Sequence, residues 1–185
     1  MLTFLSTLDA NLLLWIQDAI RTPFLTSFFT VITTLGNHGT IWIALSVCLL
    51  IPKKTRKIGI FALLALLGSL LIDNIILKNL VARIRPYEVI PNLQILIEKQ
   101  KDFSFPSGHT GSSFAAAVIF YQTFPKKYGI PLLLLAFLMG FSRLYLGVHY
   151  PSDVIAGALI GTLIAKAILY VDAHFVHKSL HTHIS

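Results

Sequence analysis

The sequence is poor in charged residues and in cysteine. Only 12% of its 185 residues are Asp, Glu, Lys or Arg, whereas 55% are hydrophobic. A soluble domain typically has about 25% charged residues, so the composition argues against a soluble protein and favours the bilayer as solvent. Cys48 is the single cysteine, which excludes an internal disulfide. Because Cys48 lies in an apolar run, we interpret it as a small core residue.

Acidic residues are also scarce, with 8 of them against 15 basic residues and a formal net charge of +7. In a soluble protein this excess would suggest a nucleic-acid partner. Here many basic residues cluster between apolar runs, as they do in loops at a membrane surface. No basic stripe with interleaved aromatic residues is visible, so we predict membrane lipids and no nucleic acid as partners.

The apolar segments predict an all-α, polytopic membrane helix bundle of about six helices, in one domain over residues 1–185. Residues 2–20 mix apolar side chains with Asp9, Asn11, Gln17 and Asp18. Residues 1–22 therefore form either an amphipathic helix in the interface or a first span. The next two runs, 23–35 and 40–52, are short for a bilayer of about 30 Å, so they form two short spans or one broken element.

Four longer helices follow, and the basic clusters set their orientation. We expect the helices at about 58–82, 108–124, 129–146 and 151–172, with a polar tail at 173–185. The clusters at 53–57 and 126–127 and the tail then share one face, which the positive-inside tendency places in the cytoplasm. The polar segment 84–107 and the turn 147–151 lie on the other face. This predicts a multi-pass plasma-membrane protein whose unusual polar residues face the extracytoplasmic side.

Three short sequence motifs contain the unusual polar residues. The first is Lys78, six residues, then Arg85-Pro86; the second is Pro106-Ser107-Gly108-His109; the third is Ser142-Arg143, five residues, His149, three residues and Asp153. Each motif falls at the outward end of a predicted span. Charged residues at membrane depth are costly and usually functional.

The residue types indicate phosphoryl chemistry. Lys78, Arg85 and Arg143 have no matching cluster of acids, so we expect an anion as their partner, and a phosphoryl group suits them. Ser107 is a good N-cap for the next helix, and Gly108 would let the backbone approach the anion. The first N–H groups of this helix point outward and favour negative charge.

Two histidines are the candidates for the nucleophile and for the proton donor. Asp153, in the first turn of the helix that begins near Pro151, can hold one ring nitrogen of His149 and leave the other free to attack. No acid lies near His109 in the sequence, so His109 is the better candidate for proton donor. Asp73 belongs to no motif, and we interpret it equally as a structural contact or as a partner of the site.

Together the motifs K-x6-RP, PSGH and SR-x5-H-x3-D resemble the signature of the type 2 phosphatidic acid phosphatase (PAP2) superfamily, which shares its site with vanadium haloperoxidases. All fixed positions are present with the family's spacing over residues 78–153. Three ordered motifs are far more specific than one PSGH alone. The resemblance implies that His149 forms a phosphohistidine, that Asp153 orients it, and that His109 protonates the leaving group. It also implies phosphate binding by Lys78, Arg85, Ser107, Gly108 and Arg143, without a metal or other cofactor.

The resemblance implies a membrane phosphatase that acts on a lipid phosphate or diphosphate. Undecaprenyl diphosphate suits a compact protein with an outward site, and phosphatidylglycerophosphate and phosphatidic acid are the alternatives. A lipid phosphotransferase would share every motif, whereas a non-catalytic lipid-phosphate binder would have no use for the His149–Asp153 pair. The apolar spans argue against a soluble haloperoxidase. We expect lipid selectivity to lie in the flanking helices and in 87–103, a segment placed to cover the site.

Overall fold

The computed structural model describes the backbone of residues 2–182 and the side chains of residues 5–174. This part of the chain is helical and without strands, so the predicted all-α bundle is confirmed. Three helical segments are long and apolar enough to cross a membrane: Arg56–Val89, Lys126–Tyr145 and Pro151–His174. A fourth crossing is formed if the bent pair Pro23–Leu35 and Asn37–Leu50 counts as one span.

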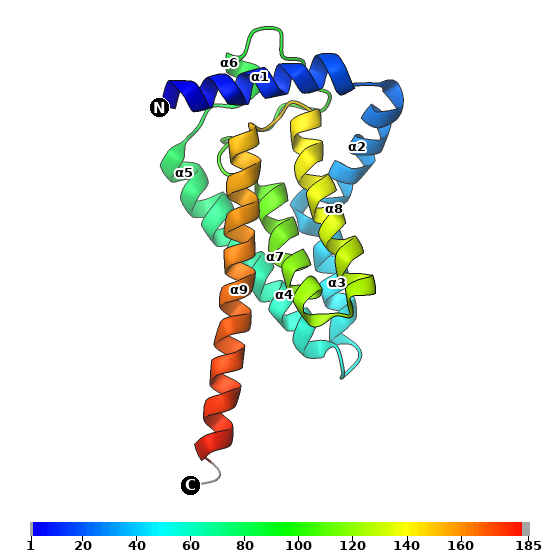
Figure 1. Ribbon diagram of the computed structural model, residues 1–185, viewed down its shortest axis with the longest axis vertical. Helices are drawn as coiled ribbons and strands as arrows, with labels where there is room; N and C mark the ends of the chain where they lie inside the picture. Colours follow the sequence, from blue (N-terminus) through cyan, green and yellow to red (C-terminus); the bar gives the residue numbers. More distant parts are fainter. Residues whose placement is uncertain (1, 183–185) are drawn as a thin grey trace.

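Helix α1 (Leu2–Ile20) lies across the top of the bundle rather than within it (Figure 1). Leu13 and Ile16 are buried against the protein, whereas Leu5, Leu8, Leu12 and Trp15 are exposed. These two sets alternate at helical spacing, as expected of an amphipathic helix. Of the two predictions for this segment, the arrangement favours the interfacial helix.

The two short runs form a broken element. Helix α2 (Pro23–Leu35) and helix α3 (Thr40–Leu50) are joined by the 3₁₀ turn η1 (Asn37–Gly39), and the pair is bent by 47°. His38 and Gly39 both have positive φ, at 53° and 70°. This left-handed backbone interrupts the helical hydrogen bonds and turns the chain. The break places Asn37 beside the second motif.

The next segment carries the first motif and departs from an α-helix. Helix α4 (Arg56–Ser69) continues as the π-helical stretch η2 (Leu70–Leu77) and the short helix α5 (Lys78–Val81). Ala82 ends α5 with a φ of 48°, and Arg85 is the N-cap of the short helix α6 (Pro86–Val89). π-Helical stretches are rare and often occur at functional sites.

Helix α7 (Gly108–Thr123) is the centre of the bundle and packs against α3, α4, helix α8 (Lys126–Tyr145) and helix α9 (Pro151–Thr182). Its residues 113–120 are buried, and many of them are small. A Cβ on Gly161 of α9 would lie 2.2 Å from the carbonyl oxygen of Gly111. Glycine therefore allows α7 and α9 to approach backbone to backbone.

The helix ends separate into two groups (Figure 1). The turn between α3 and α4, the turn between α7 and α8 and the end of α9 lie at the bottom; α1, α6 and the turn between α8 and α9 lie at the top. The three motifs therefore share one end of the bundle, as predicted. Helix α9 continues to Thr182, so most of the predicted tail 173–185 is helical, and residues 183–185 lie outside the described chain.

Candidate active site

His149 and Asp153 meet at the turn between α8 and α9. His149 is 1% exposed and Asp153 is fully buried. Nδ1 of His149 lies 3.4 Å from Oδ2 of Asp153, the contact that the spacing predicts. Pro151 is the first residue of α9, which places Asp153 in the first turn. The other ring nitrogen, Nε2, lies 3.3 Å from Nη1 of Arg85, so it faces a cation rather than open space.

Burial favours the neutral form of His149. Loss of hydration lowers its pKa to about 3, the hydrogen bond with Asp153 opposes this shift, and the nearby charge of Arg85 adds to it. The imidazole is therefore neutral at physiological pH. A neutral ring that donates from Nδ1 to the carboxylate carries its lone pair on Nε2, which is the form that a nucleophile requires.

Lys78 and Arg85 are buried and share an acidic partner that the sequence analysis missed. The carboxylate of Asp102, from the loop before α7, pairs with Nζ of Lys78 and accepts a hydrogen bond from Nη2 of Arg85 at 2.5 Å. The sequence showed no matching cluster of acids for the three cations, and in the structure Lys78 and Arg85 share this single carboxylate. Burial raises the pKa of Asp102, but the hydrogen bond and charge of Lys78 and the guanidinium of Arg85 outweigh it and hold the pKa at about 2.

Arg143 is 1% exposed and comes from the last turn of α8. Its Nη1 donates to the hydroxyl of Thr33 on α2, while its Nε is buried without a partner. A buried N–H that lacks a partner is costly. An anion in the cavity beside it would satisfy this donor, so the orphaned Nε fits a phosphate-binding role for Arg143.

The start of α7 has a different local structure from the one predicted. Ser107 is at the N-cap position, but its hydroxyl makes no capping bond and instead accepts from Thr110 Oγ1 at 2.9 Å. The N–H of Ser107 donates to the carbonyl of Asp153. A Cβ on Gly108 would lie 2.3 Å from Oδ1 of Asn74, so a larger residue here would displace the Asn74 side chain. The following N–H groups lack partners within the helix and remain suited to an anion.

His109 lines the same cavity as His149 and contacts the break between α2 and α3. Its Nε2 lies 3.0 Å from Oδ1 of Asn37. Because that amide oxygen can only accept, the contact places a proton on Nε2. Asn37 is separated from every motif in the sequence, and no spacing rule indicates it.

A cavity of about 800 Å³ joins these side chains. Lys78, Arg85, Gly108, His109, Arg143 and His149 line its polar end. Ile43, Leu63, Leu66, Leu67 and Leu70 line the other end. Ile43, Leu67 and Leu70 are 43%, 51% and 48% exposed, so the apolar end reaches the outer surface of the bundle between α3 and α4.

Asp73 lies apart from this cavity. It is fully buried, and its Oδ2 accepts a hydrogen bond from Ser69 Oγ at 2.6 Å, one turn earlier on the same helix. Of the two interpretations, this contact favours the structural one. Among the described residues, no group of three or more His, Cys, Asp or Glu side chains is arranged to hold a metal ion.

Comparison with known proteins agrees with this geometry. A model of the PAP2 superfamily matches residues 59–176. This chain belongs to the PAP2 superfamily. It is 38% identical over 141 residues to the undecaprenyl-diphosphatase of Sulfolobus acidocaldarius, covering 75% of this chain and 68% of the relative. The resemblance on the motifs is thereby confirmed, and the chain is a membrane enzyme that hydrolyses phosphate esters.

Two solved structures have the same fold. The crystal structure of Aquifex aeolicus LpxE has a TM-score of 0.77 at 32% identity, and the match covers 86% of this chain and 93% of that one. The transmembrane PAP2-type phosphatidylglycerolphosphate phosphatase from Bacillus subtilis has a TM-score of 0.73 at 27% identity, covering 91% and 86%. The helical arrangement described above is therefore shared with a transmembrane PAP2-type phosphatase.

Proposed function

We propose that the protein is a lipid phosphatase that transfers a terminal phosphoryl group from a lipid to His149 and then to water. The cavity is the observation that supports this proposal. Its polar end gathers three cations and two histidines, and its apolar end reaches the bundle surface between α3 and α4. A lipid phosphate has a head and a tail that match these two ends.

In the first step, Lys78, Arg85, Arg143 and the N-terminus of α7 hold the non-bridging phosphoryl oxygens. Nε2 of His149 attacks phosphorus, the N–P bond forms, and the bond from phosphorus to the leaving oxygen breaks. His109, in its imidazolium form, donates a proton to that oxygen and becomes neutral. Asp153 holds Nδ1–H of His149 and stabilises the positive charge that develops on the ring.

In the second step, water attacks the phosphohistidine and the N–P bond breaks. His109, now deprotonated, accepts a proton from the water, which restores its starting state. Inorganic phosphate and neutral His149 remain. The step requires no electron transfer, and the residues of the cavity supply both proton transfers.

Undecaprenyl diphosphate, converted to undecaprenyl phosphate, is the substrate that we favour. Support comes from the relative of that name at 38% identity and from an apolar groove that is open to the bilayer. Phosphatidylglycerophosphate and phosphatidic acid are the alternatives, and the Bacillus subtilis phosphatase structure at 27% identity favours the former. A phosphotransferase would differ only in the acceptor, and a mere lipid-phosphate binder leaves the buried His149–Asp153 pair unexplained.

We place the site at the extracytoplasmic face of the plasma membrane. The basic clusters at 53–57 and 126–127 lie at the end of the bundle opposite to the site. The positive-inside tendency supports a cytoplasmic position for that end. A cysteine introduced at Glu98, on the exposed loop before α7, tests this: an impermeant thiol reagent should label it in intact cells in a Cys48→Ser background.

The activity is tested on purified protein in mixed micelles with EDTA. Undecaprenyl diphosphate, phosphatidylglycerophosphate and phosphatidic acid are supplied separately, and released inorganic phosphate is measured. We expect release from at least one lipid, fastest from undecaprenyl diphosphate. Absence of release from all three would refute the proposed function, and faster release from a glycerophospholipid would replace the favoured substrate.

A further inference from the structure

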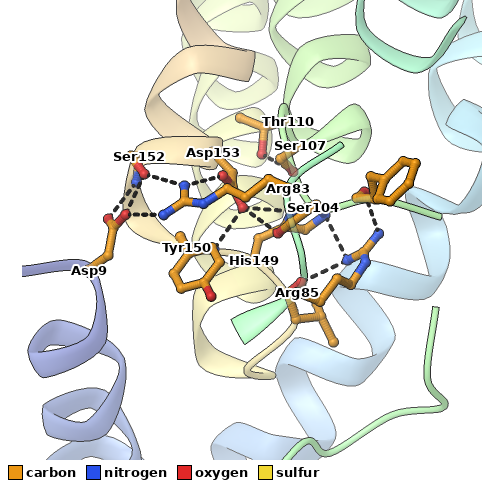
Figure 2. A network of polar contacts seen from close by, with 12 residues as sticks. Asp9, Arg83, Arg85, Ser104, Ser107, Thr110, His149, Tyr150, Ser152 and Asp153 are labelled. Atoms are coloured by element: carbon orange, nitrogen blue, oxygen red, sulfur yellow. Dashed lines mark hydrogen bonds and ion pairs between the residues drawn. The ribbon is translucent and has the colours of Figure 1, made fainter. Parts of the chain in front are cut away.

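Arg83 lies two residues before Arg85, at one of the six unspecified positions of the first motif, and its side chain points away from Arg85 toward α1 and α9 (Figure 2). Its Nη1 donates to Oδ1 of Asp153 at 2.6 Å and to Ser152 Oγ at 2.7 Å. Its Nη2 donates to Oδ2 of Asp9 at 2.7 Å. The guanidinium carbon also lies 3.7 Å from the ring centre of Tyr150. Arg83 thus bridges two carboxylates from opposite ends of the sequence.

Asp9 is the contribution of α1 to this network. It is only 5% exposed, and it lies on the face of α1 that also buries Leu13 and Ile16. Its Oδ1 accepts from the N–H of Ser152 at 3.0 Å, and its Oδ2 accepts from the Ser152 hydroxyl at 2.5 Å. Burying the charged carboxylate of Asp9 would be costly without partners. The first turn of α9 supplies hydrogen bonds to both of its oxygens.

The network gives the two carboxylate oxygens of Asp153 different hydrogen-bond partners. Oδ1 is taken by Arg83. Oδ2 accepts from Ser104 Oγ at 2.5 Å and from the N–H of Tyr150 at 3.0 Å, and it faces Nδ1 of His149 at 3.4 Å. Because the last contact is long, a small rotation of the carboxylate would lose it. Arg83 prevents that rotation by holding the opposite oxygen.

The charges of the network alternate along one line: Asp9 is negative, Arg83 positive and Asp153 negative, and His149 follows. The fully buried Asp153 needs a cation to remain ionised. Asp9 in turn shares the charge of Arg83, so that Arg83 does not fully neutralise Asp153. Asp153 therefore keeps the negative charge with which it stabilises the imidazolium form of His149 during transfer.

We propose that Arg83 and Asp9 are positioning residues that fix the Asp153 carboxylate against His149, and that α1 must be docked on the bundle for the nucleophile to be set. This inference rests on the proposed phosphoryl transfer to His149. The exposed Leu5, Leu8, Leu12 and Trp15 place the outer side of α1 in the membrane interface. Docking of α1 at that interface is thus coupled to the geometry of the nucleophile.

The test uses the full chain with Asp9→Asn, Arg83→Met, Arg83→Lys and the double variant Asp9→Asn/Arg83→Met. The measurements are kcat, KM and the inhibition constant of vanadate, an anion that probes the cation site, with the lipid that the wild type hydrolyses fastest. Asp9→Asn should lower kcat by about tenfold while KM and vanadate inhibition change by less than about twofold. Arg83→Met should lower kcat at least as much, and Arg83→Lys should recover part of the loss.

The double variant separates positioning from general support of the fold. If Asp9 acts through Arg83, adding Asp9→Asn to Arg83→Met should lower kcat by less than about threefold further. Asp18→Asn, at an exposed site on the same helix, is the matched control and should retain wild-type kcat. If Arg83→Met fails to accumulate in membranes, Arg83→Lys takes its place in the double variant.

Two results would overturn the inference: full kcat in Asp9→Asn, or a full and independent loss from each substitution in the double variant. A rise in KM with unchanged kcat would also contradict it, because that pattern indicates lost substrate binding. Failure of the proposed function looks different, since the wild type would then release no phosphate from any lipid.

Discussion

Nη2 of Arg85 donates to the Asp102 carboxylate at 2.5 Å, and the same carboxylate pairs with Lys78. Asp102 therefore pairs with two of the three cations to which we assign binding of the phosphoryl group. Its side chain is 51% exposed and lies on the loop before α7, so it can leave without disturbing a helix. A phosphoryl group that binds Lys78 and Arg85 must compete with Asp102.

Asp102→Asn removes this competing charge and should strengthen binding of anions. We expect the inhibition constants of vanadate and inorganic phosphate to fall several-fold, because a charge-assisted contact of about 1 kcal/mol no longer has to be broken. Glu98→Gln, which removes a charge from the same exposed loop, should leave both constants unchanged. Weaker inhibition in Asp102→Asn would show that Asp102 organises the cations instead of competing for them.

The low pKa of His149 predicts acid sensitivity of the fold. Its pKa of about 3 lies below the value of about 6.5 expected in an unfolded chain. The neutral ring therefore contributes stability above about pH 6.5, and this contribution is lost as the pH falls from there toward 3. Between about pH 7 and pH 5, Tm should fall further in the wild type than in His149→Gln, which cannot titrate. His174→Gln, at an exposed site on α9, should follow the wild type; equal slopes in all three proteins would contradict the prediction.

The contact between His109 and Asn37 predicts an effect that depends on the leaving group. Asn37→Ala frees the imidazole of His109 to rotate and should lower kcat by about tenfold with phosphatidic acid, whose leaving group is a lipid alcohol. The loss should be smaller with undecaprenyl diphosphate, because a leaving phosphate needs less help from an acid. His109→Ala should show the same order with larger losses. Equal losses on both lipids would argue against His109 as the proton donor.

Because α7 and α9 approach each other closely, a single methyl group added between them should cause a steric clash. In Gly161→Ala, the new Cβ would lie 2.2 Å from a backbone oxygen of α7, which cannot move without shifting that helix. Gly161→Ala should therefore destabilise the protein by about 1–3 kcal/mol and lower Tm. Gly68→Ala is the matched control, because its nearest neighbour is the flexible Ile164 side chain at 2.9 Å. A Tm loss in Gly68→Ala as large as that in Gly161→Ala would contradict this account.

The parts of the site that lie in short motifs were predictable from the sequence. Pro151 and Asp153 follow His149 within one helical turn, so local helix geometry alone brings the carboxylate to the imidazole. The placement of all three motifs at one end of the bundle followed from counting apolar spans. Local spacing and hydropathy carry this information because they act within a single element or at the membrane boundary.

The contacts between distant segments were not predictable. Asp102 reaches Lys78 over 24 residues of chain, and Asp9 reaches Arg83 over 74 residues. Neither pair has a periodicity or motif that relates its members, because their meeting depends on loop path and helix docking. For the same reason, the sequence placed Ser107 as a capping residue, whereas its hydroxyl accepts from Thr110 in the folded chain.

Capture of phosphate on His149 would test phosphoryl transfer to this residue without relying on any other step. Protein is mixed with undecaprenyl diphosphate that carries a labelled terminal phosphate, quenched in alkali during the first turnover, digested and mapped. We expect label on the peptide that contains His149 in the wild type and none in His149→Gln. Release of labelled phosphate by the wild type with no label on His149, or label retained in His149→Gln, would contradict it.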